Sequence, residues 1–153
     1  MQHWLIEQTA QIAASPALLF ELLGDVGGWR MWNRQVHFAE LEHQPSPGVT
    51  GLLYLQRWPS VRWRLEISQW HPPQALGCQL RLPGLRLQVL MRVQPGDTPQ
   101  HSQLQIQVMP LSHLAQLGWR WWQPSWQAFM AGALEGIAFA AEQAQQHQRQ
   151  PPG

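Results

Sequence analysis

The chain has 153 residues and a formal net charge of +1, and its composition includes ten tryptophans, one cysteine and no lysine. The single cysteine excludes an internal disulfide and a cysteine-based zinc cluster, and the small net charge excludes a strong overall attraction to nucleic acid or an anionic membrane. Hydrophobic residues at 44% and charged residues at 12% indicate a globular chain. Its length predicts one domain over residues 1–147, followed by a disordered tail over residues 148–153.

The N-terminal region lacks a basic stretch followed by an apolar run, which a signal peptide would need. The chain also lacks an uninterrupted apolar window of about 18 residues, the length that a membrane-spanning helix needs. A cytoplasmic location is therefore expected.

One strand and two short helices are predicted near the N-terminus. Residues 4–12 alternate between apolar and polar side chains, which predicts a strand. Ser15 is followed by a proline, and this pair predicts the N-cap and first position of an amphipathic helix over residues 16–24. Asp25 is expected to cap a second short helix that ends at Trp32.

The middle of the chain, residues 34–110, alternates with a period of two. The clearest strand covers residues 61–68, with apolar side chains on one face and arginine, glutamate and serine on the other. The predicted breaks are Pro45–Gly48, Pro59–Ser60, Pro72–Pro73, Pro83–Gly84 and Pro95–Asp97. Five breaks between six strands predict an antiparallel meander with one apolar face and one solvent-facing side.

The last segment, residues 111–148, is predicted to be helical with a cap at Ser112. Leu114, Leu117 and Trp121 form an apolar ridge before Pro124, which should kink or restart the helix. Beyond this proline, apolar residues recur at spacings of three and four, which predicts a face that packs on the sheet. These residues are Trp126, Phe129, Met130, Ala133, Ile137, Ala140, Ala141 and Ala144.

This order of elements resembles the START-related helix-grip superfamily, also called SRPBCC, which includes polyketide cyclases and lipid-transfer proteins. Residues 12–25 are similar to its opening strand and first helix, Trp29 and Trp32 to its aromatic pair, and Gly48–Gly51 to its glycine turn. The resemblance covers residues 5–143. It implies an α+β fold in which a curved seven-stranded antiparallel sheet wraps around the long C-terminal helix, with two short helices between strands 1 and 2.

The resemblance also implies a cavity between sheet and helix that accepts apolar ligands. We therefore expect binding or carriage of a hydrophobic small molecule such as a lipid, a quinone or a polyketide, without a cofactor. The predicted ligand-binding residues are Trp29, Trp32, Tyr54, Trp63, Leu65, Ile67, Val89, Met91, Ile106, Val108, Trp126, Phe129, Met130 and Ala133. Tyr54 and Arg57 would supply polar contacts if their strand faces inward.

An enzyme of the cyclase, aromatase or dehydratase type is the alternative, and it would need an acid–base group inside the cavity. Glu40 and Glu42 are candidates only if their strand face points inward, so no catalytic residue is assigned. Asp25 is interpreted as a helix cap and Cys78 as a small buried residue. A module that binds a protein partner on the same fold is the third hypothesis, and the oligomeric state stays open.

Neither a metal nor nucleic acid is expected. His37 and His43 share a strand face at a separation of about 20 Å, too far for one metal ion. Arg62 and Arg64 flank Trp63 but point to the opposite face, which does not suit a stacking groove. The four tryptophans within residues 119–126 either pack the end of the sheet or form a mouth that admits a ligand or contacts a membrane surface.

Overall fold

The computed structural model describes residues 5–149, with side chains to residue 147. Seven strands form one antiparallel sheet in the order β1-β7-β6-β5-β4-β3-β2. The elements are β1 (Ile6–Ile12), α1 (Pro16–Gly24), η2 (Val26–Gly28), α2 (Trp29–Trp32), β2 (Val36–Leu41), β3 (Thr50–Leu55), β4 (Trp58–His71), β5 (Ala75–Leu82), β6 (Leu85–Pro95), β7 (Ser102–Pro110), α3 (His113–Leu117) and α4 (Trp119–Arg149).

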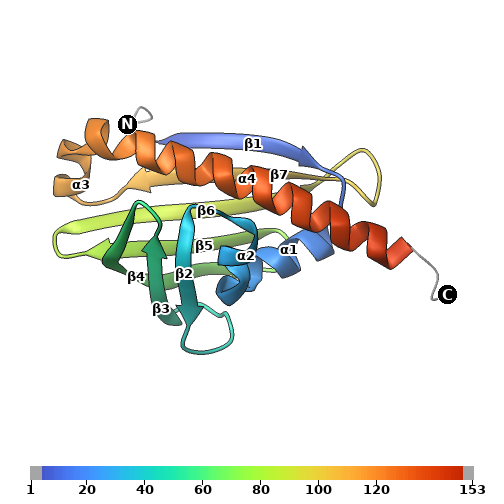
Figure 1. The fold of residues 1–153 in the computed structure, drawn as a ribbon, viewed down its shortest axis with the longest axis horizontal. Coiled ribbons are helices and arrows are strands. Elements are labelled where there is room, and N and C mark those ends of the chain that lie inside the picture. Colours follow the sequence, from blue (N-terminus) through green and yellow to red (C-terminus); the bar gives the residue numbers. More distant parts are fainter. Residues whose placement is uncertain (1–4, 150–153) are drawn as a thin grey trace.

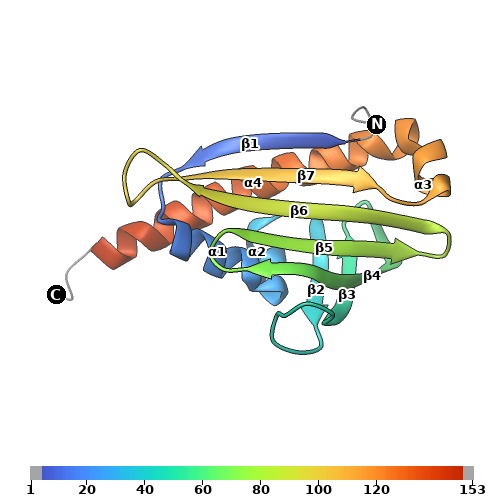
Figure 2. The same cartoon turned by 180° about the vertical axis from the view of Figure 1, so that it is seen from behind.

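The sheet is curved, and α4 lies across its concave face (Figure 1). The opposite view has the sheet in front of α4, with α3 at one end of the molecule and α1 and α2 beside the C-terminal half of α4 (Figure 2). This arrangement confirms the expected helix-grip fold. Residues 150–153 of the predicted tail lie outside the described residues, and α4 includes residues 148 and 149.

The first helix begins and ends where its sequence predicts. The Ser15 hydroxyl accepts a hydrogen bond from the Leu18 amide at 3.3 Å, and Pro16 occupies the first turn. The capping role predicted for Asp25 is wrong, because its carboxylate makes no capping hydrogen bond. A backbone bond from the Gly28 amide to the Asp25 carbonyl closes the turn instead, at 3.0 Å.

The third and fourth strands meet at a tighter turn than predicted. The turn consists of Gln56 and Arg57, and β4 already begins at Trp58, so the predicted break at Pro59 and Ser60 is wrong. Proline is tolerated there because β4 pairs with β5 only from Arg64 onward. Pro59 has no amide hydrogen, and on the side of β5 no strand is present there to accept a hydrogen bond from it.

The C-terminal helical region is interrupted at Gly118, which separates α3 from α4. The predicted restart at Pro124 is wrong, because α4 continues through that residue. Pro124 is the sixth residue of α4, so its ring removes only the bond to the carbonyl of Arg120. The Ser112 cap is confirmed by a 3.3 Å hydrogen bond from the Ala115 amide to its hydroxyl.

The core lies between the concave face of the sheet and α4, and α1 and α2 close one end of it. Apolar side chains of β4 to β7 that alternate in sequence all face this core, as predicted. Three buried polar residues connect its edges. Ser102 donates to the Ala14 carbonyl at 2.6 Å, Gln145 accepts from the Ser15 amide, and Asn33 accepts from the Gln35 amide.

Candidate functional site

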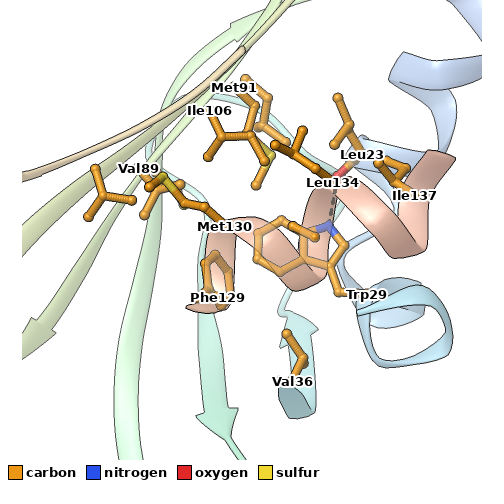
Figure 3. Packing of buried hydrophobic residues seen from close by; sticks show 14 of the residues in the cluster. Leu23, Trp29, Val36, Val89, Met91, Ile106, Phe129, Met130, Leu134 and Ile137 are labelled. Atoms are coloured by element: carbon orange, nitrogen blue, oxygen red, sulfur yellow. Dashed lines mark hydrogen bonds between the residues drawn. The ribbon is translucent and has the colours of Figure 1, made fainter. Parts of the chain in front are cut away.

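Twelve of the fourteen predicted ligand-binding residues lie together in the core. They are Trp29, Trp63, Leu65, Ile67, Val89, Met91, Ile106, Val108, Trp126, Phe129, Met130 and Ala133. Figure 3 shows side chains of β6, β7 and α4 meeting next to Trp29, whose indole N–H donates to the Leu23 carbonyl at 2.8 Å. Their contact with a ligand stays a prediction.

Aromatic rings hold the middle of this core. The Trp126 ring lies 5.5 Å from that of Trp63 and 5.4 Å from that of Phe129, both in edge-on geometry. The indole N–H groups of Trp63 and Trp126 are buried without a hydrogen-bond acceptor in the described part of the chain. Buried N–H donors nearly always have an acceptor. The indole N–H of Trp119 and the Ser68 hydroxyl are likewise buried without a partner in the described residues.

The other two predicted residues lie elsewhere. Trp32 lines a shallow depression of about 280 Å³ between α2 and α4. Tyr54 is half-buried on β3 and contacts Phe38, with ring centroids 6.3 Å apart, while its neighbours Leu53 and Leu55 are buried. Arg57 is exposed in the turn after β3, and its guanidinium lies 5.4 Å from the ring centroid of Trp58.

A larger groove lies at the α1 end of the sheet and has a volume of about 880 Å³. It is bordered by α1, η2, β2, the loop after β2 and the turn between β4 and β5. Its lining residues are Ala17, Phe20, Glu21, Gly24, Asp25, Val26, Gly27, Arg30, Phe38, Ala39, Glu40, Leu41, His43, Gln44, Pro45, Trp70, Pro72 and Pro73.

The floor of this groove is aromatic. The rings of Phe20 and Trp70 lie 5.0 Å apart and are tilted by 53°. Gly24 allows Trp70 to lie directly against α1, because a Cβ atom at Gly24 would come within 2.7 Å of the indole ring. Trp70 faces inward because a bulge between Ile67 and Gln69 shifts the alternation of β4. The floor therefore continues the apolar core outward.

The rim of the groove is charged. The carboxylates of Glu21, Asp25 and Glu40 line it together with the Arg30 guanidinium and the His43 imidazole. All five residues are exposed, and within the described residues none of them forms an ion pair. An apolar floor with a few polar groups at its edge is typical of sites for small organic molecules.

Glu40 reaches this rim because of a second bulge. Val36 pairs with Leu55, and Phe38 pairs with Tyr54, so two steps along β2 match one step along β3. The shift buries Ala39 and turns Glu40 to solvent. Glu42 is also exposed and accepts a 2.9 Å hydrogen bond from the Thr50 hydroxyl.

None of the fourteen residues predicted from the sequence lines the larger groove. Sequence reasoning missed it because its walls come from segments far apart in the chain. Its one local signal is the sequence Trp70-His71-Pro72-Pro73, which places a large aromatic residue beside rigid turn residues. A polar residue beside such a floor, as Asp25 is, could have been considered a rim residue and not only a cap.

Cys78 is the single cysteine, and it lies in β5 with the predicted small-residue role in the core. Desolvation by burial raises the pKa of its thiol to about 12. The thiol is therefore protonated at neutral pH and is not a nucleophile.

The fold and the groove define a helix-grip domain of the class that binds hydrophobic ligands. The sequence matches the family described as polyketide cyclase / dehydrase and lipid transport over residues 3–142, and the chain belongs to this family. A comparison with curated proteins gave no match. Within residues 5–149, no helix is both long and apolar enough to cross a membrane.

Solved structures with the same fold have low sequence identity to this chain. A protein from Thermus thermophilus has a TM-score of 0.74 at 14% identity, with 92% of this chain and 98% of that chain covered. A START superfamily protein from Mycobacterium smegmatis has a TM-score of 0.71 at 16% identity, with the same coverage. The di-domain ARO/CYC StfQ from the steffimycin biosynthetic pathway has a TM-score of 0.67 at 14% identity, with 94% of this chain and 46% of that chain covered.

Proposed function

We propose that this protein binds a hydrophobic small molecule in the groove between α1, β2 and the turn after β4. The observation that carries the proposal is the aromatic floor of half-buried Trp70 and buried Phe20, which line a groove of about 880 Å³. That volume is within the range of roughly 300–1,000 Å³ that small-molecule sites occupy. Burial of apolar surface would supply most of the affinity.

The chemistry of the rim favours a ligand with one polar end. A lipid, a quinone or a polyketide-like molecule would place its apolar part on Trp70 and its oxygen or nitrogen atoms near the charged residues. The family description, which includes polyketide cyclases and lipid transport, supports this ligand class.

The sheet–helix interior is a second location for the same ligand, and the twelve core residues predicted from the sequence would then contact it. The unpartnered indole N–H groups of Trp63 and Trp126 favour this location. Both donors would pair with a ligand that carries a carbonyl oxygen, such as a quinone or a polyketide. Entry would require these side chains to move, since Trp126 also contacts Phe129.

Enzymatic activity of the cyclase or dehydratase type is a second candidate function. The observation that favours it is that Asp25 and Glu40 line the same groove, where a carboxylate could transfer a proton to or from a bound substrate. In that case Glu40→Gln or Asp25→Asn would abolish turnover of a polyketide substrate while its binding persists. Unchanged turnover in both variants would exclude this role for the two carboxylates.

Filling the groove tests the binding proposal. Ala17 is exposed on α1 and lines the groove, so Ala17→Trp should occupy the site without disturbing the core. We expect it to weaken binding of a naphthalene sulfonate dye, a long-chain fatty acid and a naphthoquinone by about tenfold or more. Ala128→Trp is the matched control, because Ala128 is an exposed alanine on α4 that does not line this groove.

Two results would contradict the groove as the site. Equal affinity of the wild type and Ala17→Trp for all three probes would exclude it. Weaker quinone binding in Trp126→Phe, with Ala17→Trp unaffected, would instead locate the ligand in the interior, because this change removes the Trp126 N–H donor and keeps an aromatic ring.

A further inference from the structure

The end of the molecule opposite the groove carries exposed apolar side chains. Leu114 is 53% exposed, Leu117 is 81% exposed and Trp121 is 85% exposed. The three residues lie within eight positions of the chain, on α3 and the first turn of α4 (Figure 2). The predicted apolar ridge therefore exists, but it faces solvent and does not pack on the sheet. We call these three residues the α3 patch.

Hydrogen bonds and an aromatic contact connect the α3 patch to the sheet. The Ser112 hydroxyl donates to the Gly84 carbonyl at 2.9 Å, and the Arg86 carbonyl accepts from the Leu111 amide at 2.7 Å. On the other side, the Trp122 ring lies 5.5 Å from that of Trp58. The segment that carries the α3 patch therefore packs on the β5–β6 turn and on the start of β4.

The charge around the α3 patch is positive. Arg120 is exposed beside Trp121, Arg86 is exposed next to the α3 cap, and Arg57 is exposed over Trp58. The chain has no aspartate or glutamate between Asp97 and Glu135. The charge is therefore unevenly distributed, because three arginines lie around the α3 patch, whereas the groove has three carboxylates and one arginine, Arg30.

Two carboxylates of the sheet make polar contacts with neighbouring side chains, and only the contact of Glu66 is with a cation. Glu7 on β1 accepts a 2.9 Å hydrogen bond from the Gln107 amide group. Glu66 on β4 lies 3.9 Å from the Arg81 guanidinium. The arginines around the α3 patch, in contrast, form no ion pair within residues 5–147.

We propose that the α3 patch docks the protein on the surface of an anionic phospholipid bilayer. Leu117 and Trp121 would enter the boundary between headgroups and acyl chains, a depth at which indole rings are favoured. The three arginines would pair with lipid phosphates, and each basic residue near an anionic surface adds to the attraction. Leu114 would lie at the edge of the contact, since it also touches Gly84.

A second copy of the chain fits the α3 patch less well. A symmetric dimer would bring the arginines of one copy toward those of the other, because a two-fold contact pairs the same surface with itself. Like charges at such a contact oppose association. A lipid surface complements the α3 patch, because its acyl chains accept apolar side chains and its phosphates attract arginines.

Sedimentation with vesicles tests the proposal. We expect the wild type to bind vesicles of equal parts phosphatidylcholine and phosphatidylglycerol, and to bind pure phosphatidylcholine vesicles about tenfold more weakly. Raising the salt concentration should weaken binding to the mixed vesicles. The double variant Leu117→Ser/Trp121→Ser should bind about tenfold or more weakly, because it removes the two most exposed apolar side chains.

Two further variants separate charge from apolar contact. Arg86→Gln/Arg120→Gln should also lower binding to the mixed vesicles by about tenfold, with no effect on binding to pure phosphatidylcholine. Phe139→Ser is the matched control, because Phe139 is 68% exposed on another part of α4 and should not change binding. All changed side chains are exposed, so melting temperatures should stay near that of the wild type.

Three results would overturn the proposal. The first is no binding of the wild type to the mixed vesicles. The second is binding that Leu117→Ser/Trp121→Ser leaves unchanged. The third is a dimer in analytical ultracentrifugation that this double variant dissociates, together with no vesicle binding, which would assign the α3 patch to a second copy of the chain.

Discussion

Cys78 is buried in β5, between Leu76 and Leu80, and burial raises its pKa from 9.0 to about 12. The folded protein therefore keeps this proton at a pH where the unfolded chain loses it. The contribution of the protonated thiol to stability is fully present below pH 9 and is lost as the pH rises toward 12.

This difference predicts a pH-dependent gap between the wild type and Cys78→Ala. The free energy of unfolding of the wild type should fall more steeply above pH 9 than that of the variant, because only the wild type has the thiol to titrate. Urea unfolding of both proteins over this range measures the gap. Parallel curves would show that the thiol has the same pKa in the folded and unfolded chain.

Ser102 is a buried residue that no sequence pattern singles out. Its hydroxyl donates to the carbonyl of Ala14, which joins the start of β7 to the segment before α1. Ser102→Ala should lower the free energy of unfolding by about 1–2 kcal/mol, because it leaves the Ala14 carbonyl without this donor. Ser60→Ala, at an exposed position of β4, should be near neutral in the same urea titration. Equal stability of the two variants would contradict the role of the hydrogen bond.

Single-residue burial was predictable where alternation is uninterrupted. Trp63, Leu65 and Ile67 were placed in the core by their period of two, and all three are buried. The orientation of Glu40 was not predictable, because the bulge in β2 depends on pairing with β3. One extra residue in a strand moves every side chain that follows it to the opposite face of the sheet.

At the scale of elements, two glycines of α4 differ in what surrounds them. A Cβ atom at Gly136 would overlap the Trp32 carbonyl, so only glycine lets α4 approach α2 this closely. A Cβ atom at Gly132 would meet side-chain atoms of Asn33 and Gln35, at 3.0 and 3.1 Å. Backbone cannot move aside as easily as a side chain can.

These surroundings predict that replacement by alanine destabilises the protein more at Gly136 than at Gly132. Gly136→Ala should lower the free energy of unfolding by about 2 kcal/mol or more, because α2 must shift. Gly132→Ala should lower the free energy of unfolding much less, because alanine is more favourable than glycine in a helix by about 1 kcal/mol. Thermal and urea unfolding of both variants checks this order. A Gly136→Ala variant as stable as the wild type would mean that α2 does not contact α4 closely.

Element boundaries were predictable where one residue dictates them. Ser15 with Pro16 defined the start of α1, and Gly48, with a φ of +93°, defined the turn before β3. Two boundaries predicted from prolines were wrong. Pro59 lies inside β4 where that strand lacks a partner on one side, and Pro124 lies near the start of α4, so neither ends its element. Whether a proline breaks an element depends on its neighbours in space.

At the scale of the whole molecule, the fold was predictable and the groove was not. The order of elements resembles that of the helix-grip superfamily, which implied the fold, and the apolar face of each strand fits it because such a sheet needs a helix to cover it. The groove forms where α1, β2 and the turn after β4 meet, and its position depends on two bulges and on Gly24. Such long-range details leave little trace in a single sequence.

The molecule also separates its two exposed apolar regions. The groove with its carboxylates is bordered by α1 and β2. The α3 patch lies on α3 and the start of α4, and α3 is at one end of the molecule, away from α1 (Figure 2). A bound membrane would therefore leave the groove open to solvent. Small-molecule binding in Ala17→Trp and vesicle binding in Leu117→Ser/Trp121→Ser should be lost independently, and each assay should be insensitive to the other variant. Loss of both activities in either variant would contradict two separate sites.

Native mass spectrometry of the freshly purified protein, followed by solvent extraction, tests the central claim most directly. We predict that the wild type carries a stoichiometric apolar molecule, or takes one up from a mixture of lipids, quinones and aromatic polyketides. The Ala17→Trp variant should remain at its apo mass under the same conditions, while Ala128→Trp should behave as the wild type does. A wild type that stays at its apo mass with every member of the mixture would contradict the account.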